Sequence, residues 1–413
     1  MERGLDVFVD LAGTPVLVGR LWTRSRGTRD SSSFEYDPTW LARADRFAID
    51  PELTLVRGPM HSPRPLWNAF TDPAPDRWGQ TLLRRHEIAR ARREGRAPRT
   101  LLPIDFLTLV DDETRLGALR FRAPGSTPWL ASDGRKVPPL VELGRLLAAT
   151  TRLIDERESE DDLRLLLAPG TSLGGARPKA SIRDAGGHLA IAKFPRKDDA
   201  WPVTRWEAVA LALARSAGID VPAARLELVA RRPVLIVRRF DRRGAIRVPF
   251  ISALTALATD DGEPHSYLEL AALLRQHSPE ARRDLAQLWR RIVFNVLVSN
   301  TDDHLRNHGF VRSGDGWSLA PAYDLNPVPV DVRPRIHALA LDADDANASI
   351  ELVRSIAPQF GLVSAEAVGI MREVARAVSH WRAVGARHGL TAAQLDRMAS
   401  AFDHANLRAA RAG

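Results

Sequence analysis

Hydrophobic positions change their spacing near the middle of the chain. Before residue 240, short apolar runs such as 7–11, 16–19, 225–229 and 234–237 are bounded by turn residues, as is typical of β-strands. Beyond that point leucine, isoleucine and valine recur at helical spacing. The second pattern predicts helices over residues 266–275, 279–297, 349–360, 365–384 and 392–410. We therefore expect an α+β protein with a β-rich front half and a mainly helical back half.

Helices are also expected among the strands of the front half. The stretches 78–96, 140–154 and 205–217 have helical spacing. The first of them is rich in arginine, so it is either a basic recognition face or an ordinary solvated helix surface, and the second interpretation is favoured. A largely acidic turn over 156–162 is expected to precede a short helix over 163–167.

A polar stretch, residues 299–327, follows the most apolar run of the back half. The run itself, 292–298, predicts a buried helix. Within the polar stretch, two strand-like pieces at 310–312 and 317–319 flank Ser-Gly-Asp-Gly at 313–316, which supplies the turn residues of a hairpin. The sequence therefore predicts a helix, a polar loop and a hairpin in direct succession.

Three side chains around this hairpin have the spacing of a phosphoryl-transfer site. Protein kinases use an Asp as base, an Asn four intervening residues later as magnesium ligand, and a second Asp beyond a hairpin. Asp302 and Asn307 meet that spacing, whereas Asp303 misses it by one residue, and Asp324 follows the hairpin. Magnesium prefers oxygen ligands and keeps several waters, so Asn307 and Asp324 suffice as metal ligands beside phosphate oxygens.

A glycine-rich loop over residues 169–179 precedes a short strand that ends near Lys193. Such a loop lets the backbone approach phosphates, although it lacks the register of a Walker A motif. Only four lysines occur among 59 basic residues, and Lys179 and Lys193 fall at these two places. Because a compact ammonium is not interchangeable with a guanidinium, both lysines are predicted to contact phosphate. Glu207 is predicted either to pair with Lys193 or simply to favour the start of its helix.

The motif Thr301-Asp302-x-His304-x-Arg306-Asn307, followed by Tyr323-Asp324, resembles the HipA family of bacterial serine/threonine kinases, the toxins of HipBA toxin–antitoxin pairs. The stretch that ends in Phe240-Asp241-Arg242 resembles the strand, hinge and Phe-Asp-Arg segment of that family, which implies that the hinge backbone around Arg238 to Phe240 contacts adenine. The resemblance covers residues 5 to about 385, and it implies a bilobal kinase-like fold, ATP and Mg²⁺ as cofactors, and autophosphorylation of Ser172. The residues it implies for ATP binding are Gly174, Gly175, Ala176, Arg177, Pro178, Lys179, Lys193, Arg238, Arg239, Phe240, His304, Asn307, Tyr323 and Asp324.

The family resemblance also implies partners that the residues themselves do not show. These are a separate helix-turn-helix antitoxin similar to HipB, operator DNA bound through the antitoxin complex, and an aminoacyl-tRNA synthetase as protein substrate. The expected subdivision is an N-terminal subdomain over 1–125, a kinase N-lobe over 126–240 and a helical C-lobe over 241–413.

Composition limits the remaining possibilities. The chain has 413 residues and no cysteine, which excludes disulfides, Cys-based zinc sites and thiol catalysis. It shows no long apolar run that would span a membrane and no signal pattern, so a cytoplasmic protein without membrane contact is expected. The net charge of +8 is compatible with direct nucleic-acid contact but also with a solvated surface.

The combined interpretation is a HipA-type serine/threonine kinase in which Asp302 is the catalytic base. Two alternatives stay open at this point. One is a small-molecule kinase on a related fold, which would share the phosphate-handling residues. The other is a catalytically inactive scaffold or DNA-binding subunit, which need not bind ATP with magnesium.

Overall fold

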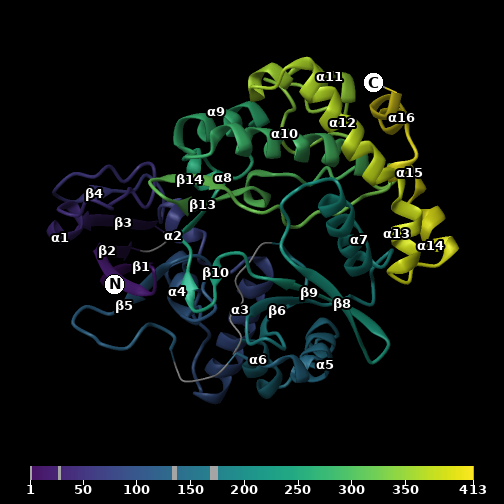
Figure 1. Ribbon diagram of the computed structural model, residues 1–413. Coiled ribbons are helices and arrows are strands. Elements are labelled where there is room, and N and C mark those ends of the chain that lie inside the picture. The colour runs from purple at the N-terminus through teal and green to yellow at the C-terminus, as the bar shows by residue number, and fades with distance from the viewer. Residues whose placement is uncertain (1, 27–28, 133–136, 168–174, 413) are drawn as a thin grey trace. The chain divides into compact units, whose positions relative to one another are not determined.

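A computed structural model describes residues 2–26, 29–132, 137–167 and 175–412 (Figure 1). The chain forms two compact units. The N-terminal unit comprises Met1–Arg196, Val229–Arg231 and Arg238–Ile251, and the C-terminal unit comprises Lys197–Leu228, Arg232–Val237 and Ser252–Gly413. The three domains expected from the sequence, with boundaries after residues 125 and 240, stay predictions.

An antiparallel sheet of five strands, in the order β4-β3-β2-β1-β5, opens the N-terminal unit. Its strands are β1 (Glu2–Leu11), β2 (Thr14–Arg26), β3 (Arg29–Tyr36), β4 (Met60–His61) and β5 (Leu119–Arg122). The strands predicted from the runs 7–11 and 16–19 are confirmed as β1 and β2, which form an antiparallel hairpin with Leu11 opposite Thr14. Leu5, Val7 and Val9 of β1 are buried, as the alternation of residues along a strand requires when one face packs against a core.

Helices complete the N-terminal unit. They are α1 (Pro38–Leu41), α2 (Asn68–Thr71), α3 (Arg77–Arg93), α4 (Pro103–Leu109), the 3-10 helix η1 (Leu140–Glu142), α5 (Leu143–Ile154) and α6 (Glu160–Leu167). The predicted acidic turn is partly wrong, because α6 already begins at Glu160. Three acidic residues lie in its first turn, where the helix dipole favours negative charge.

Further strands of the N-terminal unit come from two distant parts of the chain. Strands β6 (Lys179–Arg183) and β7 (Leu189–Lys193) pair antiparallel, and Lys179 lies directly opposite Lys193. Strands β10 (Arg242–Arg243) and β11 (Ile246–Arg247) form a small hairpin that the sequence did not predict. Strand β12 (Phe250–Ser252) follows them.

Helix α10 (Ala281–Val298) is the centre of the C-terminal unit and packs against α9 (Tyr267–His277), α11 (Ile350–Ser355) and α12 (Ser364–Ser379) (Figure 1). Its last turns are completely buried, as the apolar run 292–298 predicted. The predicted hairpin follows as β13 (Gly309–Ser313) and β14 (Gly316–Leu319). The unit also contains α7 (Val203–Ser216), β8 (Ala224–Val229), β9 (Arg232–Arg238) and α8 (Ala253–Ala256).

Two long helices expected near the C-terminus are broken. The stretch 365–384 divides at His380 into α12 and α13 (Trp381–Arg387). The stretch 392–410 divides into α14 (Ala392–Arg397), α15 (Ala399–Phe402) and α16 (Ala405–Ala412). The stretch 349–360 likewise becomes α11 and the 3-10 helix η3 (Ala357–Phe360). The breaks let Trp206, Trp381 and Phe402 pack together in the core, with Trp381 and Phe402 stacked at 4.7 Å.

The expected α+β class is therefore confirmed, with sheets in the N-terminal part of the chain and mainly helices in the C-terminal part. Among the described residues, none of the helices combines the length and apolarity needed to cross a membrane.

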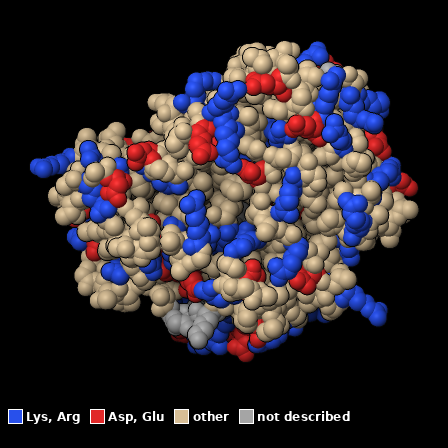
Figure 2. Space-filling view, viewed as in Figure 1, with Lys and Arg blue, Asp and Glu red and all other residues tan. Residues whose placement is uncertain are grey.

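Acidic side chains lie among the many basic ones on the face shown in Figure 2. Arginines of α3 are ion-paired as well, Arg90 with Glu94 at 2.7 Å and Arg85 with Glu158 at 2.7 Å. The more exposed of these pairs, Arg90 with Glu94, is of a kind that stabilises a protein by less than about 1 kcal/mol. These two arginines of the helix are therefore charge-paired, and the choice between a solvated surface and a basic recognition face stays a prediction.

Candidate active site

Ser299 ends α10 and directs the chain into the predicted catalytic loop. It has a left-handed backbone with φ 53°, which is uncommon for a residue other than glycine. Its hydroxyl donates to the carbonyl of Ala401 over 2.9 Å, and its own carbonyl accepts from the N–H of Val328 over 3.2 Å. These two hydrogen bonds fix the direction in which the loop leaves the helix.

Asp302, the predicted base, lies at the surface of the C-terminal unit. Its side chain is 55% exposed, and one carboxylate oxygen accepts from Nη1 of Arg333 over 3.0 Å. Asn307 lies at the end of the 3-10 helix η2 (Leu305–Asn307) and donates its side-chain N–H to the backbone carbonyl of Asp302 over 2.7 Å. Because the amide nitrogen is used in this way, the amide oxygen of Asn307 is the atom that it can offer to a cation.

Asp303 points the other way and is buried. Its carboxylate accepts from the hydroxyl of Tyr267, from Nδ1 of His337 over 2.7 Å and from the N–H of Ala338 over 2.9 Å. Burial by itself would raise the pKa of Asp303, but the His337 ring and these hydrogen bonds outweigh it, so the pKa lies below its ordinary value. The neighbouring residues Asp302 and Asp303 therefore divide into an accessible carboxylate and a structural one.

Amide side chains connect this loop to the segment that holds Asp324. Asn295 donates to the hydroxyl of Tyr267, and Asn300 donates to the side-chain oxygen of Asn295, each over 3.0 Å. The N–H of Asn326 then donates to the side-chain oxygen of Asn300 over 3.0 Å, and the Asn326 amide donates to Asp324 over 3.2 Å. Asp324 has a left-handed backbone with φ 56°, so this hydrogen-bonded chain also stabilises an uncommon conformation.

Two further residues of the family motif flank η2. Tyr323 donates its hydroxyl to the backbone carbonyl of Arg306 over 2.9 Å, and the Arg306 guanidinium pairs with Asp261 at 2.8 Å. His304 is exposed directly before η2. The contacts that the sequence predicted between His304, Tyr323 and a nucleotide stay predictions.

In the N-terminal unit, Lys179 is buried and its ammonium is already paired. It donates to Asp76 over 2.6 Å and to the carbonyl of Gly175 over 3.3 Å. The other carboxylate oxygen of Asp76 caps the start of α3 by accepting from the N–H of Gly79 over 2.8 Å. The Lys179 ammonium therefore joins strand β6 to helix α3 in this structure, and its predicted contact with phosphate stays a prediction.

The remaining phosphate-loop residues divide between described and undescribed positions. Ser172 and Gly174 lie outside the described residues. Gly175 has φ 97°, a backbone conformation that favours glycine, and Ala176 follows it on the surface. The carbonyl of Pro178 accepts from the N–H of Phe194 over 2.9 Å, which continues the pairing of β6 with β7.

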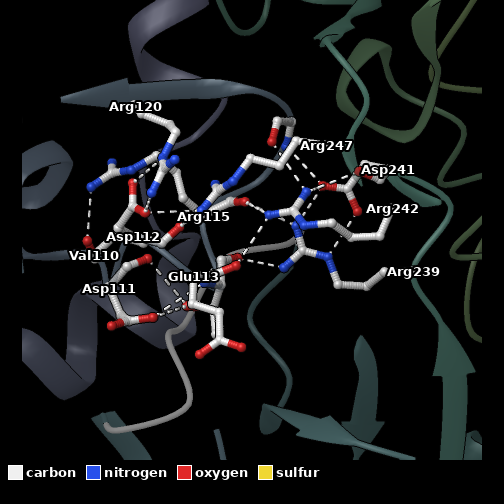
Figure 3. A network of polar contacts seen from close by, with 12 residues as sticks. Val110, Asp111, Asp112, Glu113, Arg115, Arg120, Arg239, Asp241, Arg242 and Arg247 are labelled. Carbon is white, nitrogen blue, oxygen red and sulfur yellow. Dashed lines mark hydrogen bonds and ion pairs between the residues drawn. The ribbon is translucent and has the colours of Figure 1, made fainter. Parts of the chain in front are cut away.

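The predicted hinge residues lead into a buried network of arginines and carboxylates (Figure 3). Arg238 is exposed, whereas Arg239 is buried and pairs with Asp241 at 2.5 Å. Asp241 also pairs with Arg242 at 2.6 Å and accepts from the N–H of Gly117 over 2.8 Å. Burial would raise the pKa of Asp241, but the two guanidinium groups hold it well below its ordinary value.

Hydrogen bonds of the same network join Arg242 and Arg247, which follow the hinge, to the loop that contains Arg115. Arg242 donates to the carbonyl of Arg115 over 2.6 Å, and Arg247 donates to the carbonyl of Asp112 over 2.6 Å. Asp112 in turn pairs with Arg120 at 2.5 Å. Asp241 and Arg242 of the motif are therefore structural in the N-terminal unit, and the backbone contact with adenine predicted around Arg238 to Phe240 stays a prediction.

Sequence reasoning missed the residues that support the loop. Tyr267, Asn300 and His337 lie outside the kinase spacing, so the motif did not indicate them. Asn295 did offer a signal, because it is a lone amide inside the apolar run of α10. Glu207 is buried on α7 in the C-terminal unit, and its pairing with Lys193 stays a prediction.

The fold and this site define a two-unit α+β protein whose helical part carries an Asp-x-x-x-x-Asn loop ahead of a hairpin and a further aspartate. A solved structure, that of the Shewanella oneidensis MR-1 toxin–antitoxin system of HipA, HipB and operator DNA, contains a chain of the same fold. The TM-score is 0.70 with 17% identity, and the match covers 98% of this chain and 96% of that chain.

Residues 171–381, more than half of the chain, match the family described as HipA-like C-terminal domain. The chain therefore belongs to the HipA-like family, and the resemblance found in the sequence is confirmed. A Sinorhizobium fredii protein named "Putative kinase Y4mE" is 30% identical over 182 residues, which are 37% of this chain and 41% of the relative. Toxin YjjJ of Escherichia coli is 25% identical over 170 residues, which are 38% of each protein. These matches span about two fifths of the relatives' own lengths.

Proposed function

We propose that the protein is an ATP- and Mg²⁺-dependent serine/threonine kinase of HipA type, the toxin component of a type II toxin–antitoxin system. One observation carries the proposal. Asp302 is exposed while its backbone carbonyl is held by Asn307 over 2.7 Å, and hydrogen bonds through Asn300 join the same loop to the segment of Asp324. The three residues that kinase chemistry requires thus share one supporting framework.

Asp302 is the base in this proposal. Its exposed carboxylate orients the acceptor hydroxyl and receives the hydroxyl proton as the phosphoryl group is transferred. The neighbouring carboxylate, Asp303, is unsuited to that role because it is buried and accepts three hydrogen bonds. Catalysis then depends mainly on positioning and on stabilising charge, as in other phosphoryl transfers.

The donor atoms around the loop fit magnesium. Asn307 and Asp324 would hold the ion through an amide oxygen and a carboxylate, which are hard ligands that Mg²⁺ prefers. The described residues contain no cluster of three or more His, Asp or Glu side chains able to hold a metal, and a magnesium ion shared with phosphates needs none. When bound, the ion would neutralise phosphate charge.

Lys193 is proposed to contact the nucleotide phosphates, with support from Lys179 and the loop over residues 174–178. The antiparallel pairing that sets Lys193 opposite Lys179 supports this assignment, because it brings both lysines to the same end of the β6–β7 pair. His304, Tyr323 and the hinge residues 238–240 are proposed to complete the nucleotide site.

The partners are proposed from the relatives. HipA of Shewanella oneidensis was solved with HipB and operator DNA, and we infer an equivalent separate antitoxin for this chain. The inferred acceptors are Ser172 of the chain itself and a protein substrate, for which an aminoacyl-tRNA synthetase is the first to test.

The deciding experiment is phosphoryl transfer from labelled ATP with Mg²⁺, followed by mass spectrometry. We expect phosphate on Ser172 of the wild type and none in Asp302→Asn. Asp396→Asn is the matched control, because Asp396 is an exposed, ion-paired carboxylate at 73% side-chain exposure, and it should behave as wild type. Label found only on a sugar or amino alcohol would assign a small-molecule kinase, and absence of ATP binding by calorimetry would assign an inactive scaffold.

A further inference from the structure

Residues 328–337 follow the Asp324 loop and end at His337. This segment presents aliphatic side chains to solvent. Val330 is 46% exposed, Val332 is 49% exposed and Ile336 is 51% exposed. They account for three of the large hydrophobic residues that stay exposed in the described chain. Single exposed aliphatic residues need no explanation, but three within seven residues concentrate exposed apolar side chains on one short segment, and large exposed apolar patches mark interaction sites.

This segment is anchored, so its exposure is a property of the fold. The N–H of Val328 donates to Ser299, and the N–H of Val330 donates to the hydroxyl of Ser400 over 3.1 Å. A turn then follows in which the N–H of Val332 donates to the carbonyl of Pro329 over 3.0 Å. At the far end, the His337 N–H donates to the carbonyl of Ala346 over 2.8 Å, and its ring binds Asp303.

Arg333 lies within this surface and contacts the proposed base. Its guanidinium is 42% exposed and pairs with Asp302 at 3.0 Å. An ion pair this exposed is weak, typically below about 1 kcal/mol, so another carboxylate can readily replace Asp302. Replacement would free the Asp302 oxygen that an acceptor hydroxyl must reach. The carboxylate of Asp331 does not compete with Asp302 for the Arg333 guanidinium, because Asp331 is already paired with Arg397 at 3.0 Å.

We propose that residues 328–337 are the docking surface for the stretch of protein substrate that flanks the acceptor serine or threonine. Aliphatic side chains of the substrate pack on Val330, Val332 and Ile336, and a substrate Asp or Glu takes Arg333 away from Asp302. The inference rests on the proposed kinase function and adds a substrate class to it: an apolar segment with one carboxylate near the acceptor.

The charge pattern favours a peptide over other occupants. Nucleic acid is bound by several cations that face phosphates. Here Arg397 is neutralised by Asp331 and the Arg335 guanidinium donates to the Ser299 hydroxyl over 3.1 Å, so Arg333 is the guanidinium that this segment presents beside Asp302. The Arg333 guanidinium beside exposed aliphatic side chains is complementary to a peptide that carries one carboxylate beside aliphatic residues. The contact between Arg333 and Asp302 also places this surface at the residue that the acceptor hydroxyl must approach.

A positional-scanning library of serine peptides, assayed with labelled ATP and Mg²⁺, tests the proposal. We expect the wild type to prefer Asp or Glu at one position and aliphatic residues at neighbouring ones. Arg333→Ala should lose the acidic preference by about threefold to fivefold, the scale of one exposed ion pair. The double variant Val332→Ser/Ile336→Ser should raise KM for the best peptide about tenfold, with kcat within about twofold, because its losses are in binding.

Matched controls keep the result interpretable. Arg382→Ala removes another half-exposed, ion-paired arginine, and Val363→Ser removes another exposed valine, so both should retain the wild-type preferences. Circular dichroism melting of each variant checks folding.

The outcomes separate the two proposals. If the wild type transfers phosphate to no protein or peptide, the kinase function itself fails. If it phosphorylates peptides without these preferences, if Arg333→Ala keeps them, or if it phosphorylates proteins but no peptide, the docking surface is overturned and the kinase function stands. Loss of self-association in the double variant, measured by sedimentation, would assign the surface to a second copy of the chain and would also overturn it.

Discussion

The backbone N–H of Asn326 donates a hydrogen bond to the side-chain oxygen of Asn300 over 3.0 Å. This contact joins the start of the proposed catalytic loop to the segment two residues beyond Asp324, beside the hydrogen bond from Val328 to Ser299. The side-chain nitrogen of Asn300 also donates to Asn295 of α10, so both the oxygen and the nitrogen of its amide are hydrogen-bonded. The helix core, the proposed base and the proposed metal ligand are thereby connected through one buried side chain.

Asn300→Ala should therefore affect both stability and activity. Removing the amide leaves the N–H of Asn326 and the side-chain oxygen of Asn295 without this partner, which costs about 1–3 kcal/mol for each buried group. Urea denaturation should show that loss, and phosphoryl transfer should fall because Asp324 is held less firmly. Asn347→Ala, at an exposed asparagine, should change neither measurement.

The same Asp→Asn substitution should have different effects at the two adjacent aspartates: a loss of rate at Asp302 and a loss of stability at Asp303. Asp302→Asn should alter the free energy of unfolding by less than about 1 kcal/mol, because the side chain is half-exposed, but it should abolish the proton acceptance that contributes about 10²–10⁴-fold to rate. Asp303→Asn should cost about 2–4 kcal/mol, because a new N–H would face donors in a buried site. Equal stability losses in both variants would contradict this division.

Asp241→Asn should destabilise the N-terminal unit strongly. The carboxylate is buried between Arg239 and Arg242, and removing its charge leaves two guanidinium groups uncompensated. Breaking a buried pair in this way costs about 3–5 kcal/mol, which thermal or urea unfolding would detect. Asp396→Asn disrupts an exposed pair instead and should cost at most about 1 kcal/mol.

His308 should make stability depend on pH. Burial lowers the pKa of His308 to about 4, while an unfolded histidine titrates near its ordinary 6.5. The unfolded chain therefore binds a proton that the folded chain does not between these values, so this residue reduces stability as pH falls from about 6.5 to about 4, by roughly 3 kcal/mol in total. His308→Leu should remove that fall.

Comparison with wild type isolates this histidine from other groups that titrate in the same range. Burial raises the pKa of both Asp50 and Asp111 to about 6, so these carboxyls act in the opposite direction, but equally in both proteins. His380→Leu, at an exposed histidine, should keep the wild-type dependence. Parallel curves for wild type and His308→Leu between pH 4 and 6.5 would contradict the prediction.

Local patterns were sufficient to predict the elements around the site. The apolar run 292–298 predicted a buried helix, and Gly314 and Gly316 marked the turn of the following hairpin. Spacing alone distinguished Asp302 from Asp303, and the structure shows an exposed and a buried carboxylate at those positions. Each of these inferences uses residues close together in sequence, where backbone geometry determines which side chains are neighbours.

Contacts between distant residues could not be predicted in this way. Arg239 and Arg115 are separated by 124 residues, and nothing in either local pattern indicates that the carbonyl of one accepts from the guanidinium of the other. The helix breaks at His380 and Met398 were missed for a related reason. Neither place has a glycine or proline, so the helical spacing continues through both, and only tertiary packing of Trp381 and Phe402 explains the interruptions.

The position of Lys179 directly opposite Lys193 across β6 and β7 affects the local electrostatics. Two ammonium groups on directly opposite residues would repel each other, but Asp76 neutralises the first of them. The charge balance at this end of the strands therefore includes a carboxylate that also caps the start of α3. Any displacement of that helix would change the field around Lys193 without moving the strand that carries it.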